Sequence, residues 1–274
     1  MPNPREGACW AFILGSFEFF VYGWYPDTEK WRVNLSFILL IFAIVGVLKE
    51  TLPGKKYWLW FAAAFPFIAA WLLLGGLGLQ PVETSKLGGI LLTIIIGVTG
   101  ISFSLPIGIV LALGRRSNMP ALKTVCVLFI EFIRGVPLIT LLFVASTMLT
   151  YFLPPGSTFD LLMRVLIMVT LFSSAYIAEV VRGGLQGLPP GQYEAADSLG
   201  LTYWKAHRLI ILPQALKISI PGIVNTFIGL FKDTTLVLII GMMDIVGLGR
   251  ARLNDPYWLG LAGELYLFIA IFFF

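Results

Sequence analysis

Residues 87–114 read LGGILLTIIIGVTGISFSLPIGIVLALG and contain no charged side chain. A helix of this length measures about 42 Å, because each residue adds about 1.5 Å, and the hydrocarbon core of a bilayer is about 30 Å thick. The run therefore predicts a membrane-spanning helix. The composition agrees, since 58% of the 274 residues are hydrophobic and only 12% are charged, against about 25% charged in soluble domains. These values exclude a water-soluble globule, a disordered chain and a disulfide-rich scaffold.

Further apolar runs of similar length predict an all-α integral membrane protein, a polytopic helical bundle. The predicted spans are residues 33–48, 57–79, 87–114, 124–153, 161–181, 216–243 and 258–274. An eighth apolar stretch, residues 7–25, contains Glu18 and either spans the bilayer or lies along its interface. Because Glu18 interrupts this stretch, it does not resemble a cleavable signal peptide. The last run reaches Phe274 with no basic tail, which predicts that the natural chain continues beyond it.

Lys and Arg residues are divided unevenly between the loops on the two sides of the membrane. Ten lie on one side: Lys49, Lys55, Lys56, Arg115, Arg116, Lys123, Arg182, Lys205, Arg208 and Lys217. The opposite loops contain three, which are Lys86, Arg250 and Arg252. Since basic loops resist translocation, the richer side is predicted to be cytoplasmic. The net charge of +4 follows from this asymmetry and does not indicate a nucleic-acid partner.

Two of the predicted spans are interrupted. Gly135 and Pro137 stand where a continuous helix would lose backbone hydrogen bonds, so a break is expected there. Residues 232–235, Lys-Asp-Thr-Thr, predict either a second break or a plain helix end at the outer interface. In a bilayer, a broken backbone is tolerated mainly where it is buried in protein or lines a cavity. Both segments are therefore candidates for lining a pathway.

The long cytoplasmic loop, residues 182–212, has the pattern of two short helices. Two prolines at positions 189 and 190 suit a first helical turn, and Gly200 supplies a left-handed stop. Thr202 is predicted to cap a second helix that ends before Pro213. The first helix carries small residues, which let the backbone of a partner approach closely.

A specific motif runs through this loop. Glu194, Ala195, Ala196, Gly200, Ile210, Leu212 and Pro213 have the spacing of the EAA loop and resemble that of ATP-binding-cassette (ABC) importer permeases. The resemblance to the polar-amino-acid subfamily, the HisMQ type, extends through residues 131–138 (EFIRGVPL), 175–184 (AYIAEVVRGG), 212–215 (LPQA), 225 and 232–236 (KDTTL). It covers about residues 87–246.

This resemblance implies the MetI-like fold of type I ABC importer permeases. The five-span core would lie in residues 81–274 and include the EAA loop at 183–213, while residues 1–80 would form an additional N-terminal membrane region. The additional spans resemble the M-type subunit of general L-amino-acid importers.

The resemblance also implies partners in the bacterial inner membrane. They are a second permease chain, related but not identical, two cytoplasmic ATP-binding-cassette subunits and a periplasmic amino-acid-binding protein. The EAA loop would dock in a groove of the ATPase subunit, whose closure would switch the pathway from inward-open to outward-open. The chain has no GxxxxGK[ST] phosphate loop, so ATP and Mg are expected on the partner, with no catalytic residue or cofactor on this chain. Cys9, Cys126 and the single histidine, His207, indicate no metal site.

Charged and polar residues at membrane depth are candidates for the substrate pathway. They are Glu131, Arg134, Glu179, Asn225, Lys232 and Asp233, together with Pro137 at the expected break. Glu131 with Arg134, and Glu179 with Arg182, are three residues apart, so each pair is able to meet on one helix face and neutralise itself. Alternatively, Arg134 or Glu179 faces the substrate or the partner permease, since ionisable groups in a bilayer are usually functional. An amino-acid ligand would need Arg134 or free backbone N–H groups for its carboxylate. Asn225 either offers neutral hydrogen bonds or packs between helices.

Other classes of function make different predictions. A stand-alone secondary transporter or channel is the main alternative, because charge pairs and broken helices alone permit it; it predicts inverted repeats, which the sequence does not display. An intramembrane enzyme would need a nucleophile or metal constellation, and neither an HExxH nor a GxSxG motif is present. A membrane anchor that does not transport would leave uptake intact when the chain is removed.

Overall fold

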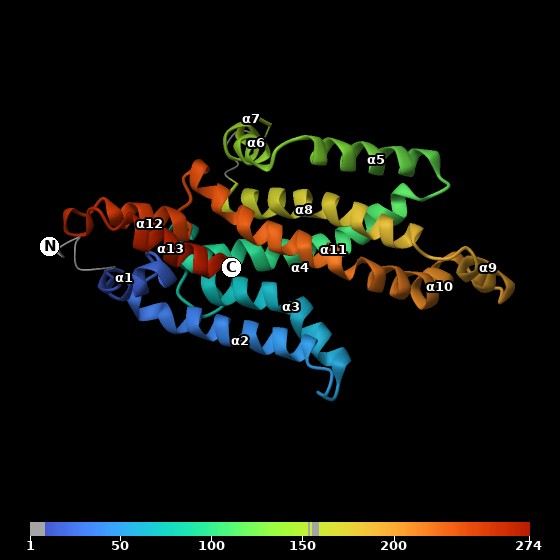
Figure 1. Cartoon of the computed structure of the whole chain (residues 1–274), viewed down its shortest axis with the longest axis horizontal. Helices are drawn as coiled ribbons and strands as arrows, with labels where there is room; N and C mark the ends of the chain where they lie inside the picture. Colours follow the sequence, from blue (N-terminus) through green and yellow to red (C-terminus); the bar gives the residue numbers. More distant parts are fainter. Residues whose placement is uncertain (1–8, 153, 155–158) are drawn as a thin grey trace. The chain divides into compact units, whose positions relative to one another are not determined.

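The structure is a computed structural model that describes residues 9–152, 154 and 159–274 (Figure 1). Every regular element in these ranges is helical, which confirms the predicted all-α class. The chain divides into two compact units, the first comprising residues 1–98 together with Phe231–Phe274 and the second Thr99–Leu230. Two helices, α4 (Gly89–Arg115) and α11 (Leu212–Asp233), continue from one unit into the other.

Five helical segments are long and apolar enough to cross a membrane. They are Asp27–Leu48, Lys55–Leu74, Gly89–Arg115, Leu161–Gln186 and Tyr203–Ile240. Each contains most of one predicted span, because an uninterrupted apolar run of this length is sufficient to specify a spanning helix. The second is shorter than predicted: the chain turns back after Leu74, and the backbone N–H of Val82 donates to the Leu74 carbonyl at 2.9 Å.

The predicted break beside Pro137 is confirmed. Helix α5 (Pro120–Gly135) and the segment Leu138–Met148 are together long and apolar enough for one span. They are bent by 102° relative to each other. The second segment begins with α6 (Leu138–Phe143) and continues through a π-helical turn, Val144–Met148, into α7 (Leu149–Phe152). Pro137 has no N–H to donate and its φ is fixed, so α5 cannot continue through it.

The helix in the last predicted span, residues 258–274, begins later than expected. It is α13 (Ala262–Phe273). A 3-10 turn, Pro256–Trp258, precedes it and is held by the Asp255 carboxylate, which accepts from the backbone N–H of Tyr257 at 3.0 Å. The eighth stretch forms a 12-residue helix, α1 (Ala11–Tyr22).

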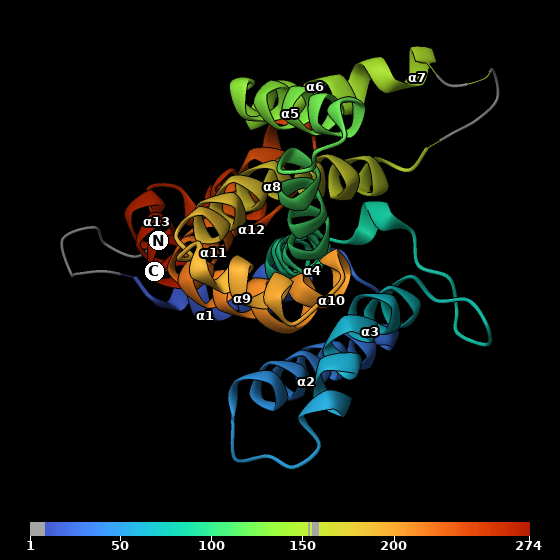
Figure 2. The same cartoon turned by 90° about the vertical axis from the view of Figure 1, so that its right-hand side faces the viewer.

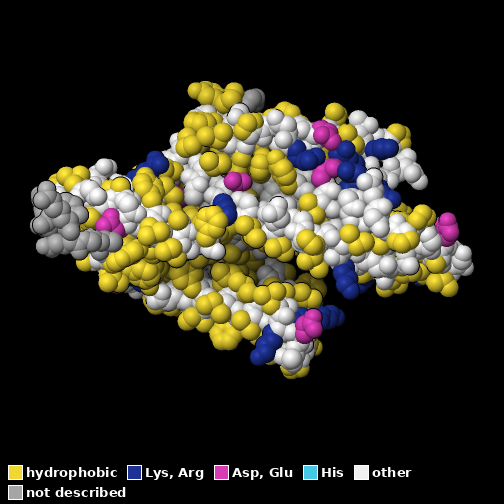
Figure 3. Space-filling model, in the orientation of Figure 1, with side chains coloured by type: hydrophobic (Ala, Val, Ile, Leu, Met, Phe, Trp, Pro, Cys, Tyr) yellow, Lys and Arg dark blue, Asp and Glu magenta, His cyan; other side chains and the backbone are white. Residues whose placement is uncertain are grey.

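The first unit contains a helical hairpin and a separate aromatic core. Helices α2 (Lys30–Leu48) and α3 (Lys55–Leu74) lie side by side (Figures 1 and 2), and their outer surface is covered by hydrophobic side chains (Figure 3). An outward-facing apolar surface of this kind suits lipid contact. The aromatic core joins α1 and α13 to α12 (Ile245–Leu253) and is formed by Phe12, Ile13, Phe20, Ile245, Leu265 and Ile269.

The second unit is organised around α8 (Leu161–Gln186). Buried residues of α8 pack against α4, α5 and α11, and the core comprises Ala112, Ile130, Ile177, Ala178, Val181, Leu185, Leu188, Ile211, Ala215 and Ile223. Helix α5 lies beside α8 in both views (Figures 1 and 2). The unit also contains the two short helices α9 (Gly191–Ser198) and α10 (Tyr203–Ala206). This arrangement places the charged residues of α4, α5 and α8 next to one another.

Candidate functional site

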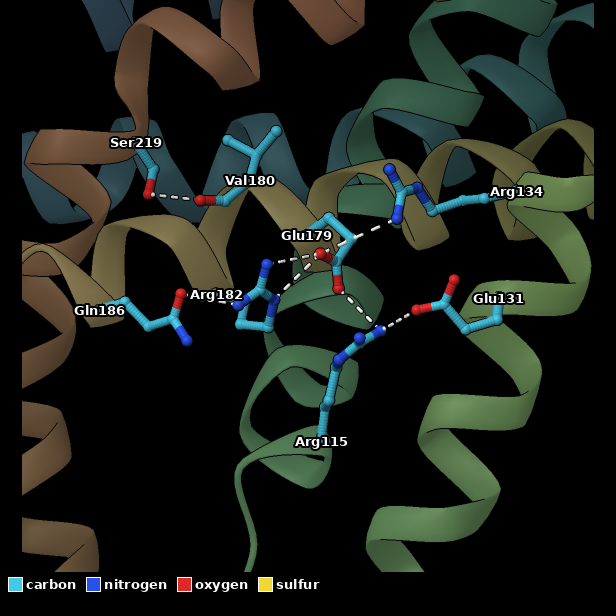
Figure 4. A network of polar contacts seen from close by, with 8 residues as sticks. All are labelled: Arg115, Glu131, Arg134, Glu179, Val180, Arg182, Gln186 and Ser219. Atoms are coloured by element: carbon cyan, nitrogen blue, oxygen red, sulfur yellow. Dashed lines mark hydrogen bonds and ion pairs between the residues drawn. The ribbon is translucent and has the colours of Figure 1, made fainter.

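Glu179 of α8 lies at the centre of a network of charged side chains (Figure 4). Its carboxylate is 2.9 Å from the Arg182 guanidinium, on the next turn of the same helix. It is also 2.9 Å from Arg115 at the end of α4 and 3.8 Å from Arg134 at the end of α5. Three helices therefore each direct one guanidinium to a single carboxylate. Only 15% of the Glu179 side chain is exposed, so these ion pairs replace the water that its charge would otherwise need.

The predicted pairing of Glu131 with Arg134 does not form. A Glu131 oxygen instead lies 2.7 Å from the Arg115 guanidinium, while the Arg134 guanidinium lies 5.5 Å from the ring centre of Tyr176. Arg134 is in the last turn of α5 and faces α8, where Tyr176 and Glu179 offer a ring face and a carboxylate. The predicted pairing of Glu179 with Arg182 does form, and Arg182 also donates to Gln186 at 2.7 Å.

Sequence reasoning did not assign Arg115 to the candidate pathway. From the sequence, Arg115 is one of the basic residues that set the orientation of the chain. In the structure it links two carboxylates, Glu131 and Glu179, that belong to different helices. Spacing along one helix gives no signal for such a contact, because it depends on where α4 ends relative to α5 and α8.

The network has one more guanidinium than carboxylates. Arg115, Arg134 and Arg182 are opposed by Glu131 and Glu179, and the side chains gather over α5 and α8 in Figure 3. Arg134 has the longest ion pair, at 3.8 Å, and 35% of its side chain is exposed. A guanidinium has five N–H donors and is able to bind a carboxylate through two parallel, bidentate hydrogen bonds. Arg134 is therefore the member of the network most available to a further anionic group.

The remaining pathway candidates lie outside this network. Pro137 follows the end of α5, whereas Asn225 is exposed on α11. Lys232 and Asp233 belong to the first unit, where the Lys232 ammonium lies 4.1 Å from the ring centre of Phe274. The interruption at 232–235 is a change of helix type, since α11 ends at Asp233 and the chain continues as a 3-10 helix, Thr234–Ile240. In the described ranges, no three His, Cys, Asp or Glu side chains lie close enough together to hold a metal ion.

The first short helix predicted for the EAA loop is confirmed, and the second begins after Thr202 as predicted. Helix α9 ends at Ser198, and Gly200 has a φ of +65°, a left-handed conformation that only glycine adopts readily. Thr202 precedes α10 in an extended conformation, but its side chain does not accept the expected capping hydrogen bond.

The predicted end of the second helix before Pro213 is wrong. Helix α10 leads through a π-helical turn, His207–Ile211, directly into α11, so that residues Tyr203–Ile240 form one long helical segment. In the π turn the backbone N–H of Leu212 donates to the carbonyl of His207, one residue further back than in an α-helix. This change of register accommodates Pro213, which has no N–H and is tolerated in the first turn of α11.

The EAA motif residues are placed differently along this loop. Glu194, Ala195 and Gly200 are exposed, Ala196 is buried, and Ile210, Leu212 and Pro213 lie on the helical segment that enters the membrane span. A Cβ atom built on Gly200 would meet no atom within 4 Å. Next to the motif, Leu199 is 73% and Trp204 72% exposed. The loop thus presents a small, open surface with apolar side chains at its edge.

Comparison with known proteins identifies the class of protein. Residues 104–274 match the model of the family described as binding-protein-dependent transport system inner membrane component. This match covers more than half of the chain. The chain belongs to this family, whose members are permease subunits of ABC transporters and not enzymes.

Two curated relatives match almost the whole chain. The inner membrane amino-acid ABC transporter permease protein YhdY of Escherichia coli (strain K12) is 51% identical over 271 residues, covering 98% of this chain and 74% of that protein. The glutamate/glutamine/aspartate/asparagine transport system permease protein BztC of Rhodobacter capsulatus is 46% identical over 328 aligned residues, covering 98% of this chain and 75% of that protein.

Solved structures of ABC transporters have the same fold. A chain of an amino acid ABC transporter crystallised with histidines is 31% identical and superposes with a TM-score of 0.59, covering 68% of this chain and 84% of that chain. A chain of the inward-facing MetNI methionine ABC transporter is 20% identical, with a TM-score of 0.51 over 66% of this chain and 84% of that one. The MetI-like fold expected from the sequence is confirmed.

Proposed function

We propose that this chain forms the translocation pathway of an ATP-driven importer for polar L-amino acids in the bacterial inner membrane. The observation that carries the proposal is the EAA loop, in which a short exposed helix with small residues adjoins the spanning helices α8 and α11. The names of the curated relatives support amino acids as the substrate class. The family match favours a binding-protein-dependent importer over a transporter that works alone.

The proposed assembly contains several other subunits. A second, related permease chain pairs with this one, two ATP-binding-cassette subunits bind ATP and Mg in the cytoplasm, and a periplasmic binding protein delivers the amino acid. The core at residues 81–274 makes these contacts, and residues 1–80 form the additional membrane region of an M-type subunit. Because this chain has no phosphate-binding loop of its own, the energy for transport comes from the ATPase subunits.

Coupling in this proposal is mechanical. The exposed surface around Glu194, Gly200 and Trp204 docks in a groove of the ATPase subunit, where small side chains allow a close approach of backbones. ATP-driven closure of the ATPase dimer draws the two permease loops together and switches the pathway from inward-open to outward-open. The states of the ATPase and of the permease are therefore linked through one contact surface.

On the pathway side, Arg134 is the residue proposed to meet the carboxylate of the amino acid. It lies beside the break between α5 and α6, and its guanidinium is the least occupied in the Glu179 network. Glu131, Pro137, Glu179, Asn225, Lys232 and Asp233 are proposed to shape or line the route. A zwitterionic ligand needs both an anion-binding and a cation-binding group, and the mixed charges of these residues supply both kinds.

The proposal is tested by purifying the chain in mild detergent and identifying the proteins that co-purify with it. We expect a P-loop ATPase with the native chain, and its loss with Glu194→Lys or Gly200→Pro. Glu50→Lys is the matched control, because it makes the same charge change on the predicted cytoplasmic side, in the turn between α2 and α3. An ATPase that is retained by both loop variants would contradict docking through this loop.

A further inference from the structure

Tyr193 of α9 connects the short helix to the ends of α4 and α8. Its hydroxyl donates to the backbone carbonyl of Leu185, in the last turn of α8, at 3.1 Å. The same hydroxyl accepts from the guanidinium of Arg116, which directly follows α4, also at 3.1 Å. The Arg116 guanidinium carbon lies 5.6 Å from the centre of the Tyr193 ring. One phenol group thus joins three segments of the second unit.

The preceding residue makes a second attachment to a different element. The side-chain amide of Gln214, on α11, donates to the Oε1 atom of Gln192 at 2.8 Å and to the carbonyl of Ile210 at 3.0 Å. Gln192 and Tyr193 are consecutive, yet one is bound to α11 and the other to α4 and α8. Attachment to α11 and to the ends of α4 and α8 restrains the orientation of α9 as well as its position.

Besides these hydrogen bonds, the Tyr193 ring packs against the core of the second unit and lies 6.4 Å from the His207 ring. Glu194, Ala195 and Leu199 are exposed, and Ala196 is the buried residue of the helix. A Cβ atom built on Gly191 or on Gly200, at either end of α9, would meet no atom within 4 Å. The two end glycines contribute no side-chain packing, so the orientation of α9 depends on the packing of the Tyr193 ring and Ala196 and on the hydrogen bonds of Gln192 and Tyr193.

We propose that Tyr193 is a positioning residue for transport: it holds α9 on the ends of α4 and α8, so that a force applied to α9 moves these helices. This inference rests on the proposed coupling function of the EAA loop. Arg116 follows Arg115, which forms ion pairs with Glu131 and Glu179. The end of α4 therefore connects α9 to the charged network beside the break in α5. Without the Tyr193 hydroxyl, α9 moves without carrying α4.

The attachment is measured first on the permease alone, in lipid nanodiscs, by hydrogen exchange of the α9 amides. Tyr193→Phe keeps the ring but removes both hydrogen bonds, and we expect exchange in α9 to rise about 2- to 10-fold, the effect of one or two net hydrogen bonds. Tyr257→Phe is the control, since Tyr257 is 62% exposed in the first unit and its ring contacts Trp258. Unchanged exchange in Tyr193→Phe would overturn the proposal.

Coupling is then measured in the complete transporter, reconstituted with its ATPase and binding protein, as uptake of a radiolabelled mixture of the common L-amino acids per ATP hydrolysed. We expect Tyr193→Phe to retain the ATPase but to lower this ratio at least about threefold, within the range of one hydrogen bond. Arg116→Gln should act in the same direction and add nothing to Tyr193→Phe. A native ratio in Tyr193→Phe, despite faster exchange, would show that the attachment is only structural. Failure of the native chain to bind any ATPase would instead refute the proposed function itself.

Discussion

Arg115 at the end of α4 and Glu179 in the C-terminal part of α8 form an ion pair of 2.9 Å that joins two spanning helices. Arg134 of α5 reaches the same carboxylate from the other side. Ionisable groups at membrane depth are costly unless they are paired. The Glu179 network therefore fixes the relative placement of α4, α5 and α8 next to the α5 break. Within it, some N–H donors of Arg134 remain available for a further ligand.

Replacing Glu179 by Gln removes the carboxylate that three arginines share. We expect the free energy of unfolding to fall by about 2–4 kcal/mol, since removing one partner of a buried ion pair costs roughly 3–5 kcal/mol and Glu179 is slightly exposed. Thermal unfolding in nanodiscs measures the change. Glu131→Gln is the control, because Glu131 is 54% exposed and its ion pair among the described residues is with Arg115, so a clearly smaller loss is expected. Equal losses in the two variants would contradict a central role for Glu179.

Arg134→Gln should impair transport without unfolding the protein. A charge-assisted hydrogen bond contributes about 1.5–3 kcal/mol, so losing the contact with the substrate carboxylate should raise the apparent KM for uptake at least about 10-fold. The melting temperature should change little, because the ion pair of Arg134 with Glu179 is long, at 3.8 Å. Lys123→Gln removes a positive charge from an exposed position of the same helix and should leave KM unchanged. A native KM in Arg134→Gln would exclude this residue as the carboxylate contact.

Two neighbouring glycines of α8 predict opposite effects of the same substitution. A Cβ atom on Gly184 would collide with the Ser219 hydroxyl and the Ala215 carbonyl of α11, whereas one on Gly183 would meet no atom within 4 Å. In both positions alanine favours the helix by up to about 1 kcal/mol. Gly184→Ala should nevertheless destabilise the protein by about 1–3 kcal/mol, because α8 and α11 must separate. Gly183→Ala should be neutral or slightly stabilising. Thermal melts of the two variants provide the comparison, and a Gly184→Ala protein as stable as Gly183→Ala would rule out the close crossing.

Asp244, in the first unit, predicts a pH dependence of stability. It caps α12 through one oxygen, which accepts from the Gly247 N–H at 2.9 Å, while its other oxygen is buried without a hydrogen-bond partner among the described residues. Burial raises the pKa of this carboxyl to about 6. The unfolded chain has a pKa of about 3.9 at this residue, so the folded state keeps the proton at higher pH than the unfolded state. The protonated carboxyl therefore contributes to the free energy of unfolding below about pH 4. This contribution is lost as the pH rises to about 6 and is absent above it.

Asp244→Asn removes this titration and retains a capping oxygen. The melting temperature of the native chain should decline, relative to that of the variant, between about pH 4 and pH 6 and run parallel to it above pH 7. The difference between the two melting temperatures at each pH cancels the effects of the other titrating groups, which both proteins share. Parallel curves over the whole range would mean that Asp244 keeps an ordinary pKa in the folded protein.

Features that depend on the local chain were predictable from the sequence. The spanning helices follow from apolar runs of sufficient length, and the 102° bend follows from Pro137, which cannot continue α5. The end of the first short helix of the EAA loop follows from Gly200, whose positive φ stops α9. In each case one residue type or one run determines the backbone without help from distant parts of the chain.

Features that depend on tertiary contacts or on an irregular helical register were not predictable. Spacing along α5 suggested that Glu131 pairs with Arg134, but the end of α4 brings Arg115 closer to Glu131. A proline was expected to end the second helix of the EAA loop, but the π turn before Pro213 shifts the hydrogen-bond register and lets the helix continue. The hydrogen bonds of Tyr193 join residues far apart in the sequence, and no motif identifies them.

We expect this chain to transport amino acids only when ATP hydrolysis drives it through partner subunits. The most direct test is uptake of a radiolabelled mixture of L-amino acids into proteoliposomes that contain the complete transporter. We predict uptake that requires ATP, the binding protein and this chain together, and that is abolished by Glu194→Lys but not by Glu50→Lys. Uptake by this chain alone, driven by an ion gradient and indifferent to ATP, would contradict the account and establish a stand-alone transporter.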